Sequence, residues 1–267
     1  MKNRSEFLNF SIEVAKQAGK IQMSHFGNIS SLEKKSTNYD LLTEADKQSE
    51  DYIIKQISLK YPQHSILSEE WGETNNSSEY KWVIDPLDGT TNFVHNLPIF
   101  AVSIGLQQNN RTICAVVYNP AADKCFYAEK DNGAYLNEDK LSVTSSITLS
   151  DSLIATGFPY LHDNRYDLSF EIFKEIYGKT RGIRRLGAAA LDLCFVAMGR
   201  FDAFYEFELK PWDICAGSLI VSEAGGIISD WDGLKAPDSG IRILASNNKV
   251  HSEIIAVLKS EKYSIFY

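Results

Sequence analysis

The order of apolar segments along the chain restricts its fold more than any other feature. Five strand-like runs follow one another between residues 65 and 129, with turn-forming Asn, Pro and Gly residues among them, and this order predicts an antiparallel meander. After about residue 139, strand-like and helix-like segments alternate, which is typical of an α/β unit. We therefore expect two halves, 1–138 and 139–267, joined by a polar stretch rich in Ser and Thr at 138–150.

Helical periodicity is clearest before the first of these runs. Apolar residues from Leu8 to Gly19 recur at intervals of three and four, which predicts a helix over about 6–24. A second periodic segment runs from about Asp46 to Leu59, so two helices should precede the first strand. The later expected elements are strands at 65–68, 81–85, 100–106, 112–118, 124–129, 153–156, 182–186, 202–207 and 226–229, and helices near 164–177, 188–198 and 212–224.

Composition and charge narrow the class of protein. The 267 residues are 44% hydrophobic and 23% charged, as in an ordinary globular chain that can build its own core. The net charge is −8 and both halves are acidic, which argues against direct binding of nucleic acid. The four cysteines form no CxxC pair, so we expect reduced, buried thiols. No apolar run is long enough for a membrane span, and we expect a soluble, cytoplasmic protein without a membrane partner.

The segment WVIDPLDGTTNF at 82–93 carries the strongest chemical signal. An apolar strand should end at Asp85, and Asp88 follows three residues later. Two carboxylates this close, with the carbonyl of Leu87 between them, can share hard cations, which prefer oxygen ligands. The segment Gly89–Thr91 lets a ligand approach the backbone, so its amides could receive a phosphate at a helix N-terminus. Metal and phosphate would then be neighbours.

Each acid of the candidate site also has a simpler explanation. Asp85 and Asp88 could form a turn after the strand. Glu69 and Glu70 could be solvated loop charges, and Asp213 could stabilise the start of a helix through the helix dipole. These acids all stand at the ends of expected elements, and that shared placement favours a common site.

Three segments resemble the signatures of the inositol monophosphatases, which belong to the magnesium-dependent, lithium-sensitive phosphatase superfamily. They are DPLDGTT at 85–91, SEE at 68–70 and WDICAG at 212–217, and the resemblance extends from DLLTEAD at 40–46 to SEAGG at 222–226. It implies an αβαβα layered sandwich, a homodimer, and a hydrolase that uses two to three Mg²⁺ ions and is inhibited by Li⁺. The substrate it implies first is myo-inositol 1-phosphate, while histidinol phosphate, fructose 1,6-bisphosphate and 3′-phosphonucleotides stay open as alternatives.

The resemblance also assigns metal ligands residue by residue. A first magnesium ion would be held by Glu69, Asp85 and the carbonyl of Leu87. A second would be held by Asp85, Asp88 and Asp213, and a weaker third by Glu69 with waters. Such ions would neutralise the phosphate oxygens, lower the pKa of a bound water and stabilise the leaving alkoxide. No covalent phosphoenzyme is then required.

Other roles follow from the same resemblance. Asp46 and Thr90 correspond to the pair that orients and deprotonates the attacking water, with Glu69 as a further catalytic residue. Asp46 also fits a capping box with Thr43, and the two roles can coexist. Lys35 corresponds to a basic residue on a mobile loop, although alone it reads as a solvated lysine. The residues expected to contact substrate are Asp88, Gly89, Thr90, Thr91, Gly187, Ala189, Glu206 and Asp213.

Several residues fall outside this assignment. Ser68 stands where many members carry Gly, and Trp71 stands where many carry Ser or Thr. Glu69 is unaffected, but the bulky ring of Trp71 could narrow or reshape the neighbouring loop. His95 is expected to be a packing or loop residue, and Arg184 and Arg185 are expected to form surface or interface ion pairs. A second class of function also stays open, because GFPY at 157–160 resembles bacterial members, some of which associate with the transcription machinery.

Overall fold

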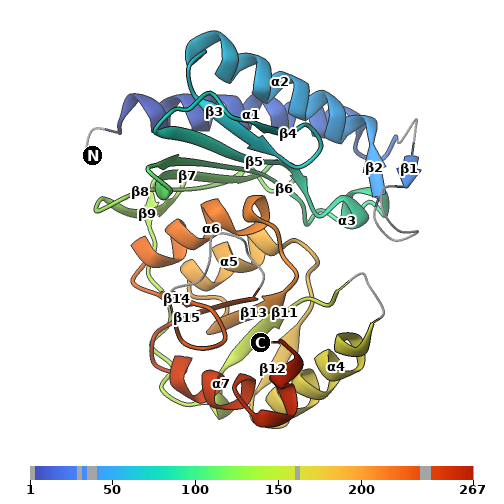
Figure 1. Ribbon diagram of the computed structural model, residues 1–267, viewed down its shortest axis with the longest axis vertical. Coiled ribbons are helices and arrows are strands. Elements are labelled where there is room, and N and C mark those ends of the chain that lie inside the picture. Colours follow the sequence, from blue (N-terminus) through green and yellow to red (C-terminus); the bar gives the residue numbers. More distant parts are fainter. Residues whose placement is uncertain (1–3, 29–31, 35–40, 160–162, 235–241, 267) are drawn as a thin grey trace.

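The computed structural model describes residues 4–28, 32–34, 41–159, 163–234 and 242–266. Their helices and strands form five layers, αβαβα, as the resemblance implied (Figure 1). From top to bottom these are α1 and α2, an eight-stranded sheet, α5 and α6, a five-stranded sheet, and α4 with α7. The helices are α1 (Glu6–His25), α2 (Glu44–Lys60), α3 (Thr90–Val94), α4 (Asn164–Tyr177), α5 (Ala189–Ala197), α6 (Pro211–Glu223) and α7 (His251–Leu258), with short 3₁₀ helices at Leu149–Asp151 and Glu261–Phe266.

The first two helices form where the periodicity predicts them. Ser5 caps α1 by accepting a hydrogen bond from the backbone N–H of Leu8, and Thr43 caps α2 in a capping box. The expectation that no strand separates these helices is wrong, because β1 (Leu32–Lys34) and β2 (Leu41–Thr43) pair with each other between them. Strands of three residues are too short to display an alternating pattern.

The eight-stranded sheet has the order β10-β9-β8-β7-β6-β5-β3-β4. Strands β5 to β8 form the predicted antiparallel meander, which continues into the unpredicted strands β9 and β10. The exception is β3, which pairs antiparallel with the missed strand β4 and parallel with β5. The chain therefore enters the meander only after this hairpin. The strands are β3 (Ser65–Ser68), β4 (Gly72–Thr74), β5 (Tyr80–Asp88), β6 (Ala101–Gln108), β7 (Arg111–Asn119), β8 (Lys124–Glu129), β9 (Gly133–Leu136) and β10 (Asp139–Lys140).

The central strand β5 continues beyond its expected end. It was expected to stop at Asp85, but it pairs with β6 as far as Asp88, which lies opposite Ala101. The register shifts between Asp85 and Asp88, as in a β-bulge that redirects nearby side chains. Both aspartates are therefore held by the sheet itself and not by a flexible turn.

The five-stranded sheet has the order β12-β11-β13-β15-β14. Its first three strands are parallel, and β15 pairs antiparallel with β13 and β14. Helices α5 and α6 are apolar on nearly all sides because they lie between the two sheets and share one core with both. The division at 138–139 stays a prediction. The strands are β11 (Leu153–Thr156), β12 (Gly182–Arg184), β13 (Ala203–Phe207), β14 (Ile227–Ser229) and β15 (Arg242–Ser246).

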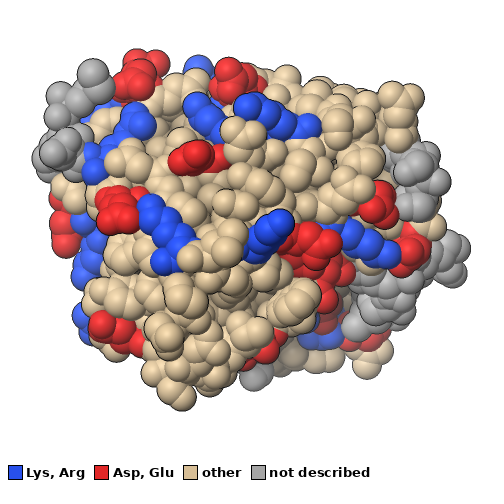
Figure 2. Space-filling view, turned by 90° about the horizontal axis from the view of Figure 1, so that it is seen from above, with Lys and Arg blue, Asp and Glu red and all other residues tan. Residues whose placement is uncertain are grey.

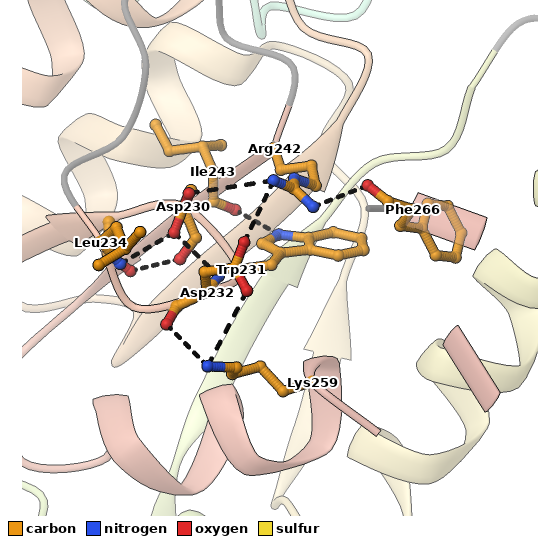
Figure 3. A network of polar contacts seen from close by, with 9 residues as sticks. Asp230, Trp231, Asp232, Leu234, Arg242, Ile243, Lys259 and Phe266 are labelled. Atoms are coloured by element: carbon orange, nitrogen blue, oxygen red, sulfur yellow. Dashed lines mark hydrogen bonds and ion pairs between the residues drawn. The ribbon is translucent and has the colours of Figure 1, made fainter. Parts of the chain in front are cut away.

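The C-terminal end is tied to the five-stranded sheet by a polar network (Figure 3). Arg242 donates a hydrogen bond of 2.7 Å to the carbonyl oxygen of Phe266 and one of 3.4 Å to Asp232. The indole N–H of Trp231 donates to the carbonyl oxygen of Ile243 at 3.0 Å. These contacts fix the loop after β14 and the last 3₁₀ helix against β15.

Other sequence-level expectations concern the cysteines and the surface. All four cysteines are free and buried, as predicted. On the outer face of α1 and α2, basic and acidic side chains are interspersed (Figure 2), and Lys47 and Lys60 pair with Glu33 and Glu6. Among the described residues, no helix is long and apolar enough to cross a membrane.

Candidate active site

Four predicted metal ligands lie within electrostatic reach of one another beside the bulge of β5. Asp85 is 2% exposed. Burial, and then the negative charges of Glu69, Asp88 and Asp213, raise the pKa of Asp85 well above its ordinary value. These acids come from the turn after β3, from β5 and from the first turn of α6. The structure therefore brings together side chains that lie up to 144 residues apart in the sequence.

Asp88 joins the first sheet to α5. Its two carboxylate oxygens accept hydrogen bonds from the backbone N–H groups of Ala189 at 3.1 Å and Ala190 at 2.9 Å. Burial raises the pKa of Asp88 to about 7, although these N–H bonds oppose the shift. Asp88 thus caps α5, and the N–H group of Ala189, a predicted substrate contact, already has an acceptor.

Asp213 and Glu206 approach from the second half of the chain. The backbone N–H of Lys210 donates to Asp213 at 2.6 Å, and burial, followed by the charge of Glu69, raises the pKa of Asp213. Burial and then the charge of Asp213 raise the pKa of Glu206 to about 8, while Arg185 opposes this shift. The predicted substrate contact Glu206 therefore lies within electrostatic reach of the acids.

Asp46 and Thr90 are hydrogen-bond partners. The Thr90 hydroxyl lies 3.0 Å from Asp46 Oδ1 and 3.1 Å from the carbonyl oxygen of Leu87. The other oxygen of Asp46 accepts bonds from the backbone N–H and hydroxyl of Thr43. The capping contact and the contact with Thr90 therefore coexist, one on each oxygen of the same carboxylate.

Gly89 allows the two halves to approach each other closely. Its φ of 89° is in the left-handed region that favours glycine. A Cβ atom here would lie 2.8 Å from the carbonyl oxygen of Ile99 and 3.2 Å from the Cβ of Ala188. Asn92, two residues into α3, donates to the carbonyl oxygens of Ile99 and Leu186 at 2.8 Å each. The start of α3 is therefore fastened to the turn that contains Gly187.

The donor set fits magnesium by its chemistry. The candidate ligands are carboxylates and one carbonyl oxygen, which hard cations prefer, and the carboxylates of Asp85, Asp88 and Asp213 are buried with like charges as neighbours. Among the described residues, no three such side chains already surround one point.

Some predicted site residues are not placed in this cluster. Lys35 lies outside the described residues. Thr91 is half-buried in α3, and His95 is exposed just after this helix, as expected for a loop residue. Arg184 is exposed and donates to its neighbour's carbonyl oxygen. The metal and substrate roles themselves stay predictions.

Sequence reasoning missed three residues around Glu206 and Gly187. Gly157 lies against the Glu206 carboxylate, since a Cβ atom built on Gly157 would be 2.1 Å from Glu206 Oε1. The guanidinium group of Arg185 lies beside Gly187, although the sequence suggested a surface or interface ion pair. Asn92 had no sequence signal, because its partners are backbone carbonyls that only the fold brings near.

Known proteins resemble the chain over almost its whole length. A protein named putative Nus factor SuhB, from Neisseria meningitidis serogroup B, is 40% identical over 256 residues, which cover 95% of this chain and 98% of that protein. A protein named inositol-1-monophosphatase, from Mesorhizobium japonicum, is 37% identical over 258 residues, which cover 96% and 97%.

The fold is shared with solved structures of the same group. The extragenic suppressor protein suhB from Bartonella henselae matches with a TM-score of 0.91 at 35% identity, over 96% of this chain and 100% of that chain. The family model described as "Inositol monophosphatase family" matches residues 3–263. The chain belongs to the inositol monophosphatase family, whose members are phosphomonoesterases.

Proposed function

We propose that this protein hydrolyses a phosphate monoester in the presence of Mg²⁺, with myo-inositol 1-phosphate as the first candidate substrate. The observation that carries the proposal is the buried group Asp85, Asp88 and Asp213, together with Glu69, beside the hydrogen-bonded pair Asp46 and Thr90. Buried like charges destabilise one another unless a cation or a proton neutralises them. A cation site at this position is therefore the simplest function of the group.

In the proposed mechanism, Glu69, Asp85, Asp88, Asp213 and the carbonyl oxygen of Leu87 would hold the metal ions. Magnesium bound there would supply positive charge that neutralises the phosphate oxygens and polarises water. The Thr90 hydroxyl orients the attacking water, and Asp46 accepts a proton through this hydroxyl. The backbone of Gly89 to Thr91 positions the phosphoryl group, so that water and leaving group lie in line. The ester P–O bond breaks as the bond to the water oxygen forms, and the leaving alkoxide takes up a proton from solvent water.

The part of the site that would contact the inositol ring comes from the second half of the chain. The charges of Asp213 and Asp88 act on Glu206, and the carbonyl oxygen of Gly187 lies beside Gly89. Acceptors of this kind suit the hydroxyl groups of inositol. The name of the Mesorhizobium relative supports inositol 1-phosphate. Histidinol phosphate, fructose 1,6-bisphosphate and 3′-phosphonucleotides remain the alternative substrates.

Phosphate release from the purified protein tests the proposal. The four substrates are inositol 1-phosphate, histidinol phosphate, fructose 1,6-bisphosphate and 3′-phosphoadenosine 5′-phosphate, each with Mg²⁺ and with EDTA. We expect turnover that requires Mg²⁺, is inhibited by Li⁺ and is fastest with inositol 1-phosphate. A hundredfold higher kcat/KM with histidinol phosphate than with inositol 1-phosphate would make histidinol phosphate the substrate. If the folded protein turns over none of the four substrates, the proposed activity is contradicted.

A second candidate function is regulatory binding to the transcription machinery. The observation that favours it is the name of the Neisseria relative, putative Nus factor SuhB, at 40% identity. The net charge of −8 favours a protein partner over RNA. Pull-down with the tagged protein from native lysate should recover a transcription component, and its absence counts against this function.

The expected homodimer is tested by the mass of the protein in solution.

A further inference from the structure

Glu50 is a buried carboxylate next to the candidate active site that the proposed mechanism does not use. It lies on α2, one helical turn after Asp46, and is 5% exposed. Residues four positions apart lie on the same face of a helix. The two acids nevertheless hold different segments, because Asp46 contacts Thr90 whereas Glu50 contacts the turn after β3.

A single oxygen atom of Glu50 accepts three hydrogen bonds from this turn. The donors are the hydroxyl of Ser68, in a very short bond, and the backbone N–H groups of Glu70 and Trp71, each at 3.0 Å. The backbone N–H of Glu69 itself donates to the carbonyl oxygen of Ile84 on β5, at 3.3 Å. The backbone of Glu69 is therefore held from one side by α2 and from the other by β5.

We propose that Glu50 is a positioning residue for the candidate metal ligand Glu69. Hydrogen bonds to a carboxylate are stronger than those between neutral groups, and buried donors that lose their acceptor destabilise the local geometry. Glu50 thereby restricts the turn 68–71 to one conformation and directs the Glu69 side chain to the acids on β5 and α6. The inference rests on the proposed function, because it requires Glu69 to hold a metal ion.

Ser68 supplies the side-chain member of this set of donors. Its side chain is fully buried against Glu50, and a glycine at this position would leave only the two backbone donors. Ser68 therefore makes a contact with Glu50 that a glycine could not make. It gives the turn one additional bond to α2.

A titration with Mn²⁺ tests the proposal without relying on turnover. The electron paramagnetic resonance signal of the free ion measures how much Mn²⁺ the protein binds. Carboxylate sites that suit Mg²⁺ also take Mn²⁺. We expect Glu50→Ala to weaken Mn²⁺ binding by about tenfold, as for other groups that orient metal ligands. Glu50→Gln should recover most of this loss, because its amide oxygen accepts the same backbone bonds.

Asp202→Ala is the matched control. Asp202 is also 5% exposed and also accepts bonds from a backbone N–H and a hydroxyl, those of Leu153 and Thr144, but it lies in the second half of the chain. Both Asp202→Ala and Glu50→Ala should lower the melting temperature. Only Glu50→Ala should weaken Mn²⁺ binding, and an unchanged Mn²⁺ affinity in folded Glu50→Ala overturns the proposal.

The same Mn²⁺ titration applies if Glu50→Ala does not fold, with Ser68→Gly as the variant. We expect Ser68→Gly to bind Mn²⁺ about two- to threefold more weakly, because the turn loses one donor. An affinity equal to that of the wild type overturns the proposal. If the wild type binds no Mn²⁺ and releases no phosphate, the proposed function fails together with the inference. If the wild type does both and Glu50→Ala binds equally well, only the inference fails.

Discussion

The Thr90 hydroxyl group lies 3.0 Å from Asp46 Oδ1, although 44 residues separate the two positions. The other oxygen of Asp46 accepts the N–H and hydroxyl of Thr43 at 2.8 and 2.6 Å. The carboxylate of Asp46 therefore caps the start of α2 and also accepts a hydrogen bond from the Thr90 hydroxyl group beside the buried acids. The residue that fixes the helix is also the candidate proton acceptor.

Thr90→Val removes this hydroxyl and leaves the shape of the side chain almost unchanged. We expect kcat to fall by about 10²- to 10³-fold, since positioned proton transfer contributes on this scale. The melting temperature should change little, because Asp46 keeps its bonds to Thr43. Thr180→Val, on an external turn, is the control and should keep the wild-type kcat. A wild-type kcat in Thr90→Val would show that the pair is structural only.

The buried acids predict an unusual pH dependence of stability in metal-free protein. Burial raises the pKa of Asp88 to about 7 and that of Glu206 to about 8 in the folded state. The folded protein then holds more protons than the unfolded chain, so the free energy of unfolding should fall as the pH rises from about 5 to about 8. Melting temperatures measured across this range in EDTA check the direction.

Magnesium should reverse this trend. Metal ions bind the deprotonated carboxylates, so Mg²⁺ should raise the melting temperature more at about pH 8 than at about pH 5. Asp88→Asn removes one of the titrating groups and should flatten the pH dependence in EDTA. A metal-free protein that becomes more stable as the pH rises, with no response to Mg²⁺, would contradict this electrostatic account.

Gly157→Ala tests whether the position of the Glu206 carboxylate matters for substrate binding. A Cβ atom at position 157 would lie 2.1 Å from Glu206 Oε1, so the flexible end of Glu206 must move away. We expect KM for inositol 1-phosphate to rise by about tenfold, the scale of one lost hydrogen bond, with a smaller change in kcat. Gly178→Ala is the control, because its Cβ atom would make only ordinary contacts. Equal KM values in both variants count against a substrate contact by Glu206.

The network around Arg242 in Figure 3 should affect stability but not activity. Arg242→Leu leaves the carbonyl oxygen of Phe266 without its 2.7 Å donor, and we expect the free energy of unfolding to fall by about 1 to 3 kcal/mol. Arg181→Leu breaks only the exposed pair with Asp151 and should cost less than about 0.5 kcal/mol. Urea unfolding measures both, and equal losses would show that the network adds nothing beyond a surface pair.

Much of the fold was predictable because long elements carry strong patterns. The helices α1, α2 and α4 and the strand β8 lie within two residues of their expected bounds. The strands β1, β2, β4, β9 and β10 were missed, since two to four residues cannot display a period. The strand β15 and the helix α7 were also missed. The extension of β5 to Asp88 was missed because a bulge, which depends on the neighbouring strand, looks like a turn in the sequence.

The candidate site also contains residues that the sequence could predict and residues that it could not. Asp85 and Asp88 could be found because they are close together in one motif, and Glu69 and Asp213 because they also stand at the ends of expected elements. The family resemblance then assigned all four as metal ligands. Glu50 and Gly157 could not be found, because their partners, the turn after β3 and Glu206, are adjacent only in the folded chain. A residue that acts through backbone N–H groups leaves no pattern in a single sequence.

The most direct test of the central claim compares phosphate release by wild-type protein and by Asp85→Asn, with Mg²⁺ and with EDTA. Asp85 is buried among the other acids, and replacing its carboxylate by an amide removes one negative charge while keeping the shape. We predict Mg²⁺-dependent release by the wild type, none by Asp85→Asn, and a folded variant by circular dichroism. Release by Asp85→Asn at the wild-type rate, or wild-type release unaffected by EDTA, would contradict the account.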